Sequence, residues 1–190
     1  MRAAVFLDRD GVLNETILRD GRTYPPRGVE ELAILPGVED ACERLRNAGL
    51  TLVCVTNQPD VARGSQSRER VEAINEVLVA RLRLDAVLVC YHDDNDSCAC
   101  RKPKPGLLTQ AAESMGIELR GSIMIGDRWR DIAAGQAAGC RTVFVDRGYQ
   151  ERRPPAPDLI VSNLAAAVPW VLSFAGAKNM GCWKSELTTE

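Results

Sequence analysis

The sequence predicts an α/β fold, a Rossmann-like parallel sheet with helices on both faces. Short apolar and β-branched runs alternate along the chain with longer amphipathic stretches, which is the pattern that parallel sheets produce. Gly49, Gly116 and Gly139 stand at the ends of three amphipathic stretches, where helices commonly stop. Polar clusters follow several apolar runs directly, and such sheets bind ligands beyond the carboxyl ends of their strands. The functional site is therefore expected at that edge.

These signals delimit the expected elements. Strands are predicted over residues 3–7, 50–56, 86–91, 122–125, 141–145 and 159–161, and helices over residues 37–48, 67–82, 105–115, 129–138 and 164–174. Residues 14–35, which include Pro25-Pro26 and Gly28, are expected to form a loop-rich excursion. Because no boundary divides the chain, residues 1–177 are predicted to form one domain, followed by a loosely ordered tail over 178–190.

Composition narrows the class of protein. The 190 residues suit one α/β domain, and the 45% apolar and 26% charged contents are ordinary for a soluble protein. A net charge of −2 argues against a general nucleic-acid surface. No apolar run is long enough to span a bilayer, and the N-terminal run is too short for a signal peptide. We therefore expect a cytoplasmic monomer that acts on a small molecule.

The first candidate for chemistry is the stretch Asp8-Arg9-Asp10-Gly11, directly after the first strand. Two carboxylates two residues apart at a strand end can converge on one cation, and Gly11 permits a tight turn. The alternative is a plain acidic loop. The preceding apolar strand and the following Val12-Leu13-Asn14 favour a site.

Two further clusters offer phosphate-binding groups. Thr56-Asn57-Gln58 ends the second long strand, where a hydroxyl and an amide can hold phosphate oxygens. Arg101-Lys102 precedes a helix, and a lysine there can neutralise a phosphate and orient a carboxylate. Taken alone, the first cluster is more often an ordinary turn, and the second is as often a solvated basic turn.

A fourth cluster, Gly126-Asp127-Arg128, follows the strand predicted over 122–125. An acid at this strand end can complete a Mg²⁺ site, because magnesium prefers oxygen ligands and keeps several waters. Asp131 lies four residues further on. For this residue, helix capping or hydrogen bonding and metal ligation are equally favoured.

A compact cysteine and histidine pattern predicts a zinc loop over residues 90–100. Cys90, His92, Cys98 and Cys100 offer three thiolates and one imidazole, a set that closes a tetrahedral zinc site and leaves no position for a catalytic water. The competing interpretation is free cysteines beside a surface histidine, and the C-x-H and C-x-C pairing favours zinc. The remaining cysteines on apolar faces, Cys42, Cys54 and Cys140, are expected to pack in the core.

Taken in order, the four strand-end motifs resemble the haloacid dehalogenase (HAD) superfamily. The resemblance implies that Asp8 is a nucleophile and that Asp10 is the general acid and base, which also binds Mg²⁺ through its backbone carbonyl. It further implies that Thr56 and Lys102 hold the phosphoryl group. Asp8 and Asp127 would then supply carboxylates to the Mg²⁺ site.

A closer resemblance is to the D-glycero-D-manno-heptose 1,7-bisphosphate phosphatases. The similarity lies in FLDRDGVLN, in TNQ followed by ARG, in C-x-H and C-x-C-R-K-P-x-P-G, and in GDRxxD. It implies a minimal cap, a place in heptose biosynthesis, and Mg²⁺-dependent hydrolysis of the C7 phosphate through an aspartyl-phosphate. The chain departs from that family at Pro59-Asp60, where Ser-Gly is usual, and in its short loop over 93–97.

The second phosphate of such a substrate would need its own partners. Arg101 and Arg128 flank Lys102 and Asp127 and are candidates to bind it, with surface charge as the alternative for each; Asn57 is a further candidate substrate contact. Competing functions are a histidinol-phosphate phosphatase, a polynucleotide 3′-phosphatase and a zinc-stabilised binding module without catalysis. The polynucleotide enzyme is disfavoured because no basic groove is visible, and the module because every catalytic position is filled.

Overall fold

The computed structural model describes residues 2–19 and 22–181. At its centre is a six-stranded sheet in the order β5-β4-β1-β6-β7-β8, and every neighbouring pair is parallel. The strands are β1 (Ala4–Leu7), β4 (Thr51–Asn57), β5 (Ala86–Cys90), β6 (Ile123–Gly126), β7 (Arg141–Val145) and β8 (Leu159–Val161). The predicted parallel α/β class is confirmed.

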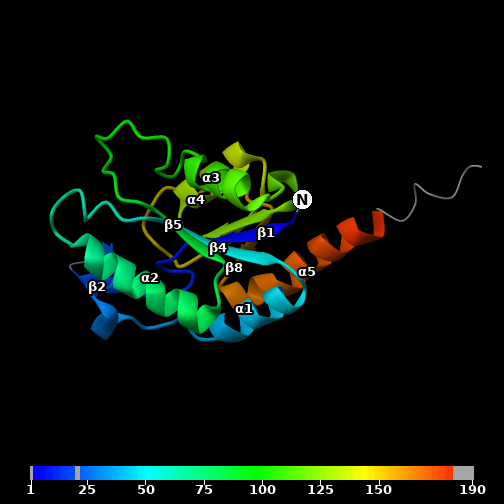
Figure 1. Ribbon diagram of the computed structural model, residues 1–190, viewed down its shortest axis with the longest axis horizontal. Helices are drawn as coiled ribbons and strands as arrows, with labels where there is room; N and C mark the ends of the chain where they lie inside the picture. Colours follow the sequence, from blue (N-terminus) through cyan, green and yellow to red (C-terminus); the bar gives the residue numbers. More distant parts are fainter. Residues whose placement is uncertain (1, 20–21, 182–190) are drawn as a thin grey trace, which may run out of the picture.

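Helices cover both faces of this sheet (Figure 1). On one face lie α1 (Val38–Asn47), α2 (Arg68–Leu82) and α5 (Leu164–Gly181), and on the other lie α3 (Gly106–Met115) and α4 (Trp129–Ala138). The central strand β1 serves both layers, because successive side chains of a strand point to opposite faces. Val5 and Leu7 join the first core, whereas Ala4 and Phe6 join the second.

Two features differ from the sequence-based expectation. The stretch expected to be loop contains an antiparallel hairpin, β2 (Ile17–Arg19) and β3 (Arg22–Tyr24), and a 3₁₀ turn, η1 (Val29–Glu31). Elsewhere, a second 3₁₀ turn, η2 (Leu119–Gly121), precedes β6. Asp20-Gly21 between β2 and β3 is a hairpin signal in the sequence. The last helix runs past the expected residue 174 to Gly181, and residues 182–190 of the predicted tail lie outside the described residues.

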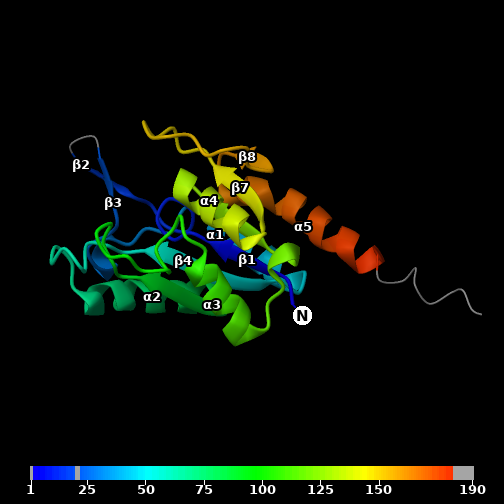
Figure 2. The same cartoon turned by 90° about the horizontal axis from the view of Figure 1, so that it is seen from above.

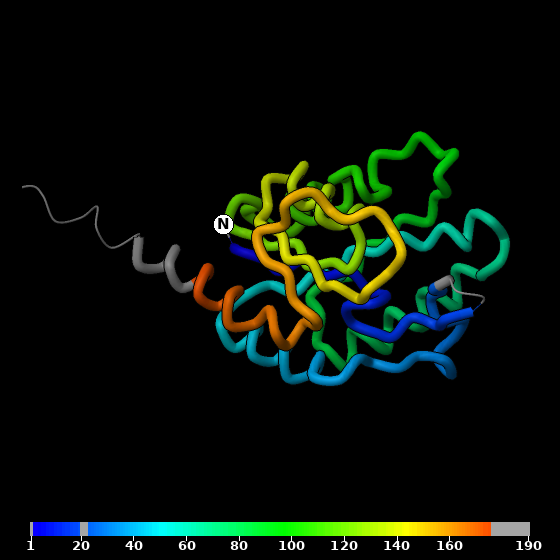
Figure 3. Tube along the Cα trace, turned by 180° about the vertical axis from the view of Figure 1, so that it is seen from behind, coloured from blue at the N-terminus to red at the C-terminus, as the bar shows by residue number. Residues whose placement is uncertain are grey.

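The hairpin is the one β insertion described between β1 and α1, which agrees with a minimal cap. It projects from the body in Figure 2, at the same end of the molecule as the loops that follow β4 and β5. Figure 3 shows that α5 leaves the body at the opposite end. Among the described helices, none has the length and apolar character needed to cross a bilayer.

Candidate active site

Three carboxylates converge at the carboxyl end of the sheet. Asp8 follows β1, Asp127 follows the neighbouring β6, and Asp131 lies in the first turn of α4. Each offers an oxygen within 4.8 Å of the others, and all three residues are buried. The Asp8 amide donates to the Ile125 carbonyl at 2.9 Å, so the ladder between the two strands carries Asp8 to its place.

Gly11 lets the loop after β1 pass directly over Asp127. Its φ is +88°, a left-handed conformation that favours glycine. A Cβ at this position would lie 1.9 Å from the Asp127 Oδ2 atom. Both backbone conformation and space therefore require glycine, and this explains the residue that follows the two acids in the motif.

The Lys102 ammonium group links the carboxylates. Its Nζ donates to Asp8 Oδ1 at 2.8 Å and to the Val55 carbonyl at 2.8 Å, and it lies 2.7 Å from Asp131 Oδ1. Burial lowers the pKa of Lys102, but the negative charges of Asp131 and Asp8 more than offset this effect, so its pKa is raised. Lys102 is therefore a fixed cation beside the Asp8 carboxylate.

Asn57 holds the backbone of Lys102 from the end of β4. Its Nδ2 donates to the Lys102 carbonyl at 3.0 Å, and its Oδ1 accepts from the Lys102 amide at 3.1 Å. The side chain expected to bind substrate thus lines the pocket while fixing the lysine.

Asp131 uses both of its oxygens within the protein. Oδ2 accepts from the Arg128 amide at 2.9 Å, which caps α4, and Oδ1 pairs with Lys102. These contacts provide the capping and hydrogen-bonding role that the sequence left open, and Asp131 also belongs to the acidic group that could hold a cation.

The Asp10 carboxylate is oriented by three side chains. Arg9 donates from Nη2 at 3.0 Å, Gln58 from Nε2 at 2.8 Å and Asn14 from Nδ2 at 2.9 Å. Gln58 Nε2 also donates to Thr56 Oγ1 at 2.9 Å, so the threonine's own hydroxyl hydrogen remains available to a ligand. The sequence motifs contain these orienting groups, but only the fold shows what each one holds.

The charges and unpaired oxygens of this cluster fit a divalent cation. Burial and the charges of Asp131 and Asp10 raise the pKa of Asp8 to about 6, despite the opposing charge of Lys102. Burial and the charges of Asp8 and Asp131 raise the pKa of Asp127 well above its usual range. Neither oxygen of Asp127 makes a hydrogen bond of normal geometry among the described residues, and the nearby Tyr149 hydroxyl only partly opposes the rise in its pKa. Because unpaired buried carboxylates are costly and oxygens are the ligands that Mg²⁺ prefers, the site is chemically suited to Mg²⁺.

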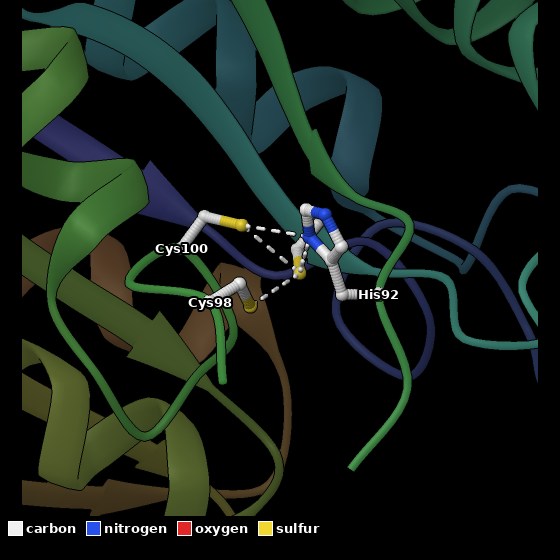
Figure 4. Close-up of side chains that lie close together, drawn as sticks. His92, Cys98 and Cys100 are labelled. Carbon is white, nitrogen blue, oxygen red and sulfur yellow. Dashed lines mark hydrogen bonds between the residues drawn. The ribbon is translucent and has the colours of Figure 1, made fainter. Parts of the chain in front are cut away.

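A second potential metal centre lies at the end of β5 and in the loop after it, where the four residues of the predicted zinc set come together. Figure 4 labels three of them, His92, Cys98 and Cys100. The Cys90 sulfur lies 3.8 Å from that of Cys98 and 3.2 Å from that of Cys100. His92 Nδ1 is 3.6 Å from Cys90 Sγ and 3.3 Å from Cys100 Sγ. A tetrahedral ion with zinc–sulfur bonds of about 2.3 Å would separate its ligands by roughly 3.5–3.8 Å. The arrangement is close to that geometry.

Purified protein should accordingly carry about one zinc per chain, and Cys100→Ser should lose both the zinc and thermal stability, because such sites add folding free energy. Cys140→Ala, which alters a cysteine outside the cluster, should keep its zinc and serves as the control. Metal analysis under reducing, chelator-free conditions measures this. A zinc content near zero in the wild type contradicts the assignment.

A pocket of about 270 Å³ opens above the carboxylates. Its wall includes residues of the hairpin, the loop after β4 and α4, among them Thr16, Thr23, Tyr24, Asp60, Arg63, Arg128 and Arg130. Four of its lining side chains are acidic (Asp8, Asp10, Asp60, Asp131) and four are basic (Arg63, Lys102, Arg128, Arg130). A bound dication would therefore make the pocket positive and favourable to an anionic substrate.

The two arginines expected to contact a second phosphate lie in different places. Arg128 lines the pocket, where its Nη2 donates to Thr23 Oγ1 at 2.6 Å. Arg101 is absent from the lining; its Nε donates to Asp94 Oδ1 at 3.0 Å and its Nη1 to the His92 carbonyl at 3.2 Å. It is thus tied to the zinc loop. Sequence reasoning did not select Arg63 or Arg130 for the pocket, although Arg63 belongs to the ARG that follows TNQ.

Comparison with known proteins identifies the family. A family model described as "HAD-hyrolase-like" matches residues 99–167. A D-glycero-beta-D-manno-heptose-1,7-bisphosphate 7-phosphatase of Pseudomonas aeruginosa is 35% identical over 184 residues, which cover 90% of this chain and 98% of the relative. This chain belongs to the D-glycero-D-manno-heptose-1,7-bisphosphate 7-phosphatase family. As a HAD-type member of that family, it is a Mg²⁺-dependent phosphatase, a phosphoric monoester hydrolase.

Other members agree with this family assignment. The D-glycero-D-manno-heptose-1,7-bisphosphate 7-phosphatase of Thermosynechococcus vestitus is 36% identical over 193 residues, covering 90% of this chain and 95% of the relative. The crystal structure of the D,D-heptose 1,7-bisphosphate phosphatase of Bordetella bronchiseptica, complexed with magnesium and phosphate, superposes with a TM-score of 0.78 and 33% identity. That alignment covers 91% of this chain and 99% of the other. The HAD fold and the expected enzyme class are confirmed.

Proposed function

We propose that this phosphatase hydrolyses the C7 phosphate of D-glycero-D-manno-heptose 1,7-bisphosphate, with Asp8 as the nucleophile. The observation that carries the proposal is the convergence of Asp8, Lys102 and the unpaired Asp127 at one strand edge. The substrate is inferred from the names of the family members, which agree in both the sugar and the position of the phosphate.

The first step forms a covalent phosphoryl-enzyme. A carboxylate oxygen of Asp8 attacks the phosphorus in line, and the bond between phosphorus and the C7 oxygen of the sugar breaks. Two donors hold the Asp8 carboxylate in place. The Lys102 ammonium and the Arg9 backbone amide each donate to Asp8 Oδ1 at 2.8 Å. The Thr56 hydroxyl would donate to a phosphoryl oxygen, which is supported by its acceptor role toward Gln58 because its own hydrogen is left for a ligand.

Asp10 moves the protons of both steps. It gives a proton to the departing sugar oxygen, and it then takes one from the water that attacks the aspartyl-phosphate, so that Asp8 and phosphate are released. Arg9, Asn14 and Gln58 keep the carboxylate in one orientation for both transfers.

The two metals have separate roles in this proposal. Asp8, Asp127 and the backbone carbonyl of Asp10 would hold Mg²⁺, which when bound stabilises the negative charge of the transferred phosphoryl group. Zinc, held by the set around Cys90, would be structural. The zinc set fixes the loop that leads into Arg101 and Lys102, so it would affect the reaction only through that loop.

Arg128 is the proposed partner of the second phosphate, and Arg101 provides the matched comparison. Arg128→Ala should lower kcat/KM for the bisphosphate about ten- to a hundredfold, because a hydrogen bond to a charged group contributes about 1.5–3 kcal/mol. Hydrolysis of an aryl phosphate should change little. A selective loss in Arg101→Ala would place that arginine at the second phosphate as well. Equal losses on both substrates would mean that the arginine serves the fold or the reacting phosphate.

A substrate panel tests the proposed function. Heptose 1,7-bisphosphate, fructose 1,6-bisphosphate and histidinol phosphate are compared by kcat/KM in the presence of Mg²⁺, and the heptose should be preferred. Preference for histidinol phosphate would contradict the proposal and support the competing enzyme. Lack of turnover of any phosphate ester would support the non-catalytic zinc module.

A further inference from the structure

Two arginines of the catalytic pocket wall contact the zinc loop. Arg130 Nη1 lies 3.7 Å from Asp94 Oδ1, and Arg63 makes the closer contact. Arg63 lies in the turn after β4, and this turn is closed by the amides of Ser65 and Gln66, which donate to the Asp60 carbonyl at 2.9 and 3.1 Å. Arg63 lines the pocket, although the sequence did not indicate this position. Its position is set from outside the turn.

Asp93 of the zinc loop holds this guanidinium by a two-pronged contact. Arg63 Nε donates to Asp93 Oδ2 at 3.0 Å and Nη2 donates to Asp93 Oδ1 at 2.5 Å. Nη2 also reaches Asp94 Oδ2 at 3.4 Å. Two parallel hydrogen bonds fix the plane of a guanidinium as well as its location, which a single contact does not do. Asp93 directly follows His92 in the chain, so the residue that holds Arg63 is next to a residue of the zinc set.

Stability alone does not account for this clamp. The side chain of Arg63 is 43% exposed and that of Asp93 is 25% exposed, and ion pairs in such positions contribute little to folding. An unclamped arginine there would sample many rotamers in solvent. The clamp removes that freedom before a ligand arrives, which improves binding by preorganisation.

The clamp also leaves one end of the guanidinium available. Nη1 of Arg63 makes no hydrogen bond among the described residues, and its carboxylate partner is Asp60 Oδ1 at 3.6 Å, beyond hydrogen-bond distance. A donor pair without a hydrogen-bond partner, held on the wall of a phosphatase pocket, suits an anionic group of the substrate.

We propose that Asp93 is a positioning residue, which acts through Arg63 to favour substrates that carry a second phosphate. The inference rests on the proposed function, because it takes the bisphosphate as substrate. Arg63 would contact the non-reacting phosphate, and Asp93 would touch neither substrate nor metal.

A double-mutant cycle tests the proposal with two substrates that differ by one phosphate, heptose 1,7-bisphosphate and heptose 7-phosphate. Arg63→Ala should raise KM for the bisphosphate about tenfold and Asp93→Asn about three- to fivefold, with kcat little changed. KM for the 7-phosphate should stay constant. Since Asp93 acts through Arg63, adding Asp93→Asn to Arg63→Ala should have no further effect.

Two controls separate positioning from structural damage. Glu72→Gln removes an exposed carboxylate that pairs with Arg68 at 2.7 Å on α2, and it should behave as wild type. Zinc content should be the same in Asp93→Asn as in wild type. A wild type that does not hydrolyse the bisphosphate overturns the proposed function. If the wild type prefers the bisphosphate, two results overturn only the role of Asp93. One is an unchanged or lowered KM for the bisphosphate in Asp93→Asn, and the other is that the effects of Arg63→Ala and Asp93→Asn add fully in the double mutant.

Discussion

Asp8→Asn is expected to lower kcat by at least about 10⁴-fold, because an amide cannot form the acyl-phosphate through which the reaction passes. The fold should persist. Lys102 loses one charged partner but retains Asp131 at 2.7 Å and the Val55 carbonyl at 2.8 Å. Turnover of an aryl phosphate with Mg²⁺ measures the effect, and circular dichroism with thermal unfolding checks the fold.

Asp40→Asn is the matched control for that experiment. Asp40 lies on α1 with its side chain 70% exposed, so the same change of chemistry there should leave turnover at the wild-type level. Should Asp8→Asn retain more than a trace of activity, Asp8 is not the nucleophile and the covalent route is wrong.

Strong local signals made most of the fold predictable. All six sheet strands were expected within one residue at each end because they are short apolar runs bounded by turns, and β7 and β8 matched fully. The β2–β3 hairpin was missed because its strands have three residues each, too short for an alternating pattern, and Leu18 is exposed rather than buried. The extension of α5 was missed because residues 175–181 include two glycines and an asparagine, which have low helix propensity and indicated an end near residue 174.

The candidate site likewise has residues that could be predicted from sequence and contacts that could not. Asp8, Thr56 and Asp127 could be grouped from sequence because each stands at a strand end, and β4, β1 and β6 are adjacent in the sheet. The setting of Arg9 could not be foreseen. Its side chain is fully buried, and its Nη1 donates to Asn75 Oδ1 at 3.0 Å on α2, a contact across 66 positions of sequence. Long-range pairings of this kind leave no local pattern.

Arg101 and Arg128 show the limit of arguing from neighbours. Both flank a site residue in the sequence and looked equivalent as phosphate ligands. In the fold, Asn57 fixes the Lys102 backbone, and the side chain of Arg101 packs on the zinc loop with an exposed fraction of 9%. Arg128, at the start of α4, faces the hairpin and the pocket. Adjacency in sequence therefore indicates that an arginine lies near the site, but not whether its side chain points into the pocket.

Asp127→Asn should have opposite effects on activity and on the stability of the metal-free protein. Activity should fall at least about a hundredfold, because the variant lacks a carboxylate of the Mg²⁺ site. In chelator, however, the free energy of unfolding should rise by about 1–2 kcal/mol, because the change removes a buried charge whose oxygens make no hydrogen bond of normal geometry among the described residues.

The stability difference between Asp127→Asn and the wild type should also depend on pH, in a direction set by the pKa of Asp127. Burial and the charges of Asp8 and Asp131 raise the pKa of Asp127, so the folded metal-free chain holds a proton that the unfolded chain releases at lower pH. The contribution of Asp127 to stability is therefore fully present in acid and is lost as pH rises through its raised folded-state pKa. The gain from Asp127→Asn should grow from about pH 5 to about pH 8.

Denaturant unfolding of both proteins in chelator, at both pH values, measures this difference, and Asp40→Asn should show none. Repeating the measurement with Mg²⁺ should stabilise the wild type but not Asp127→Asn, because a ligand stabilises only the form that binds it. A variant that is less stable than wild type in chelator at the higher pH would mean that the Asp127 carboxylate is satisfied without a cation. In that case the unpaired oxygens would no longer support a Mg²⁺ site at the edge of β6.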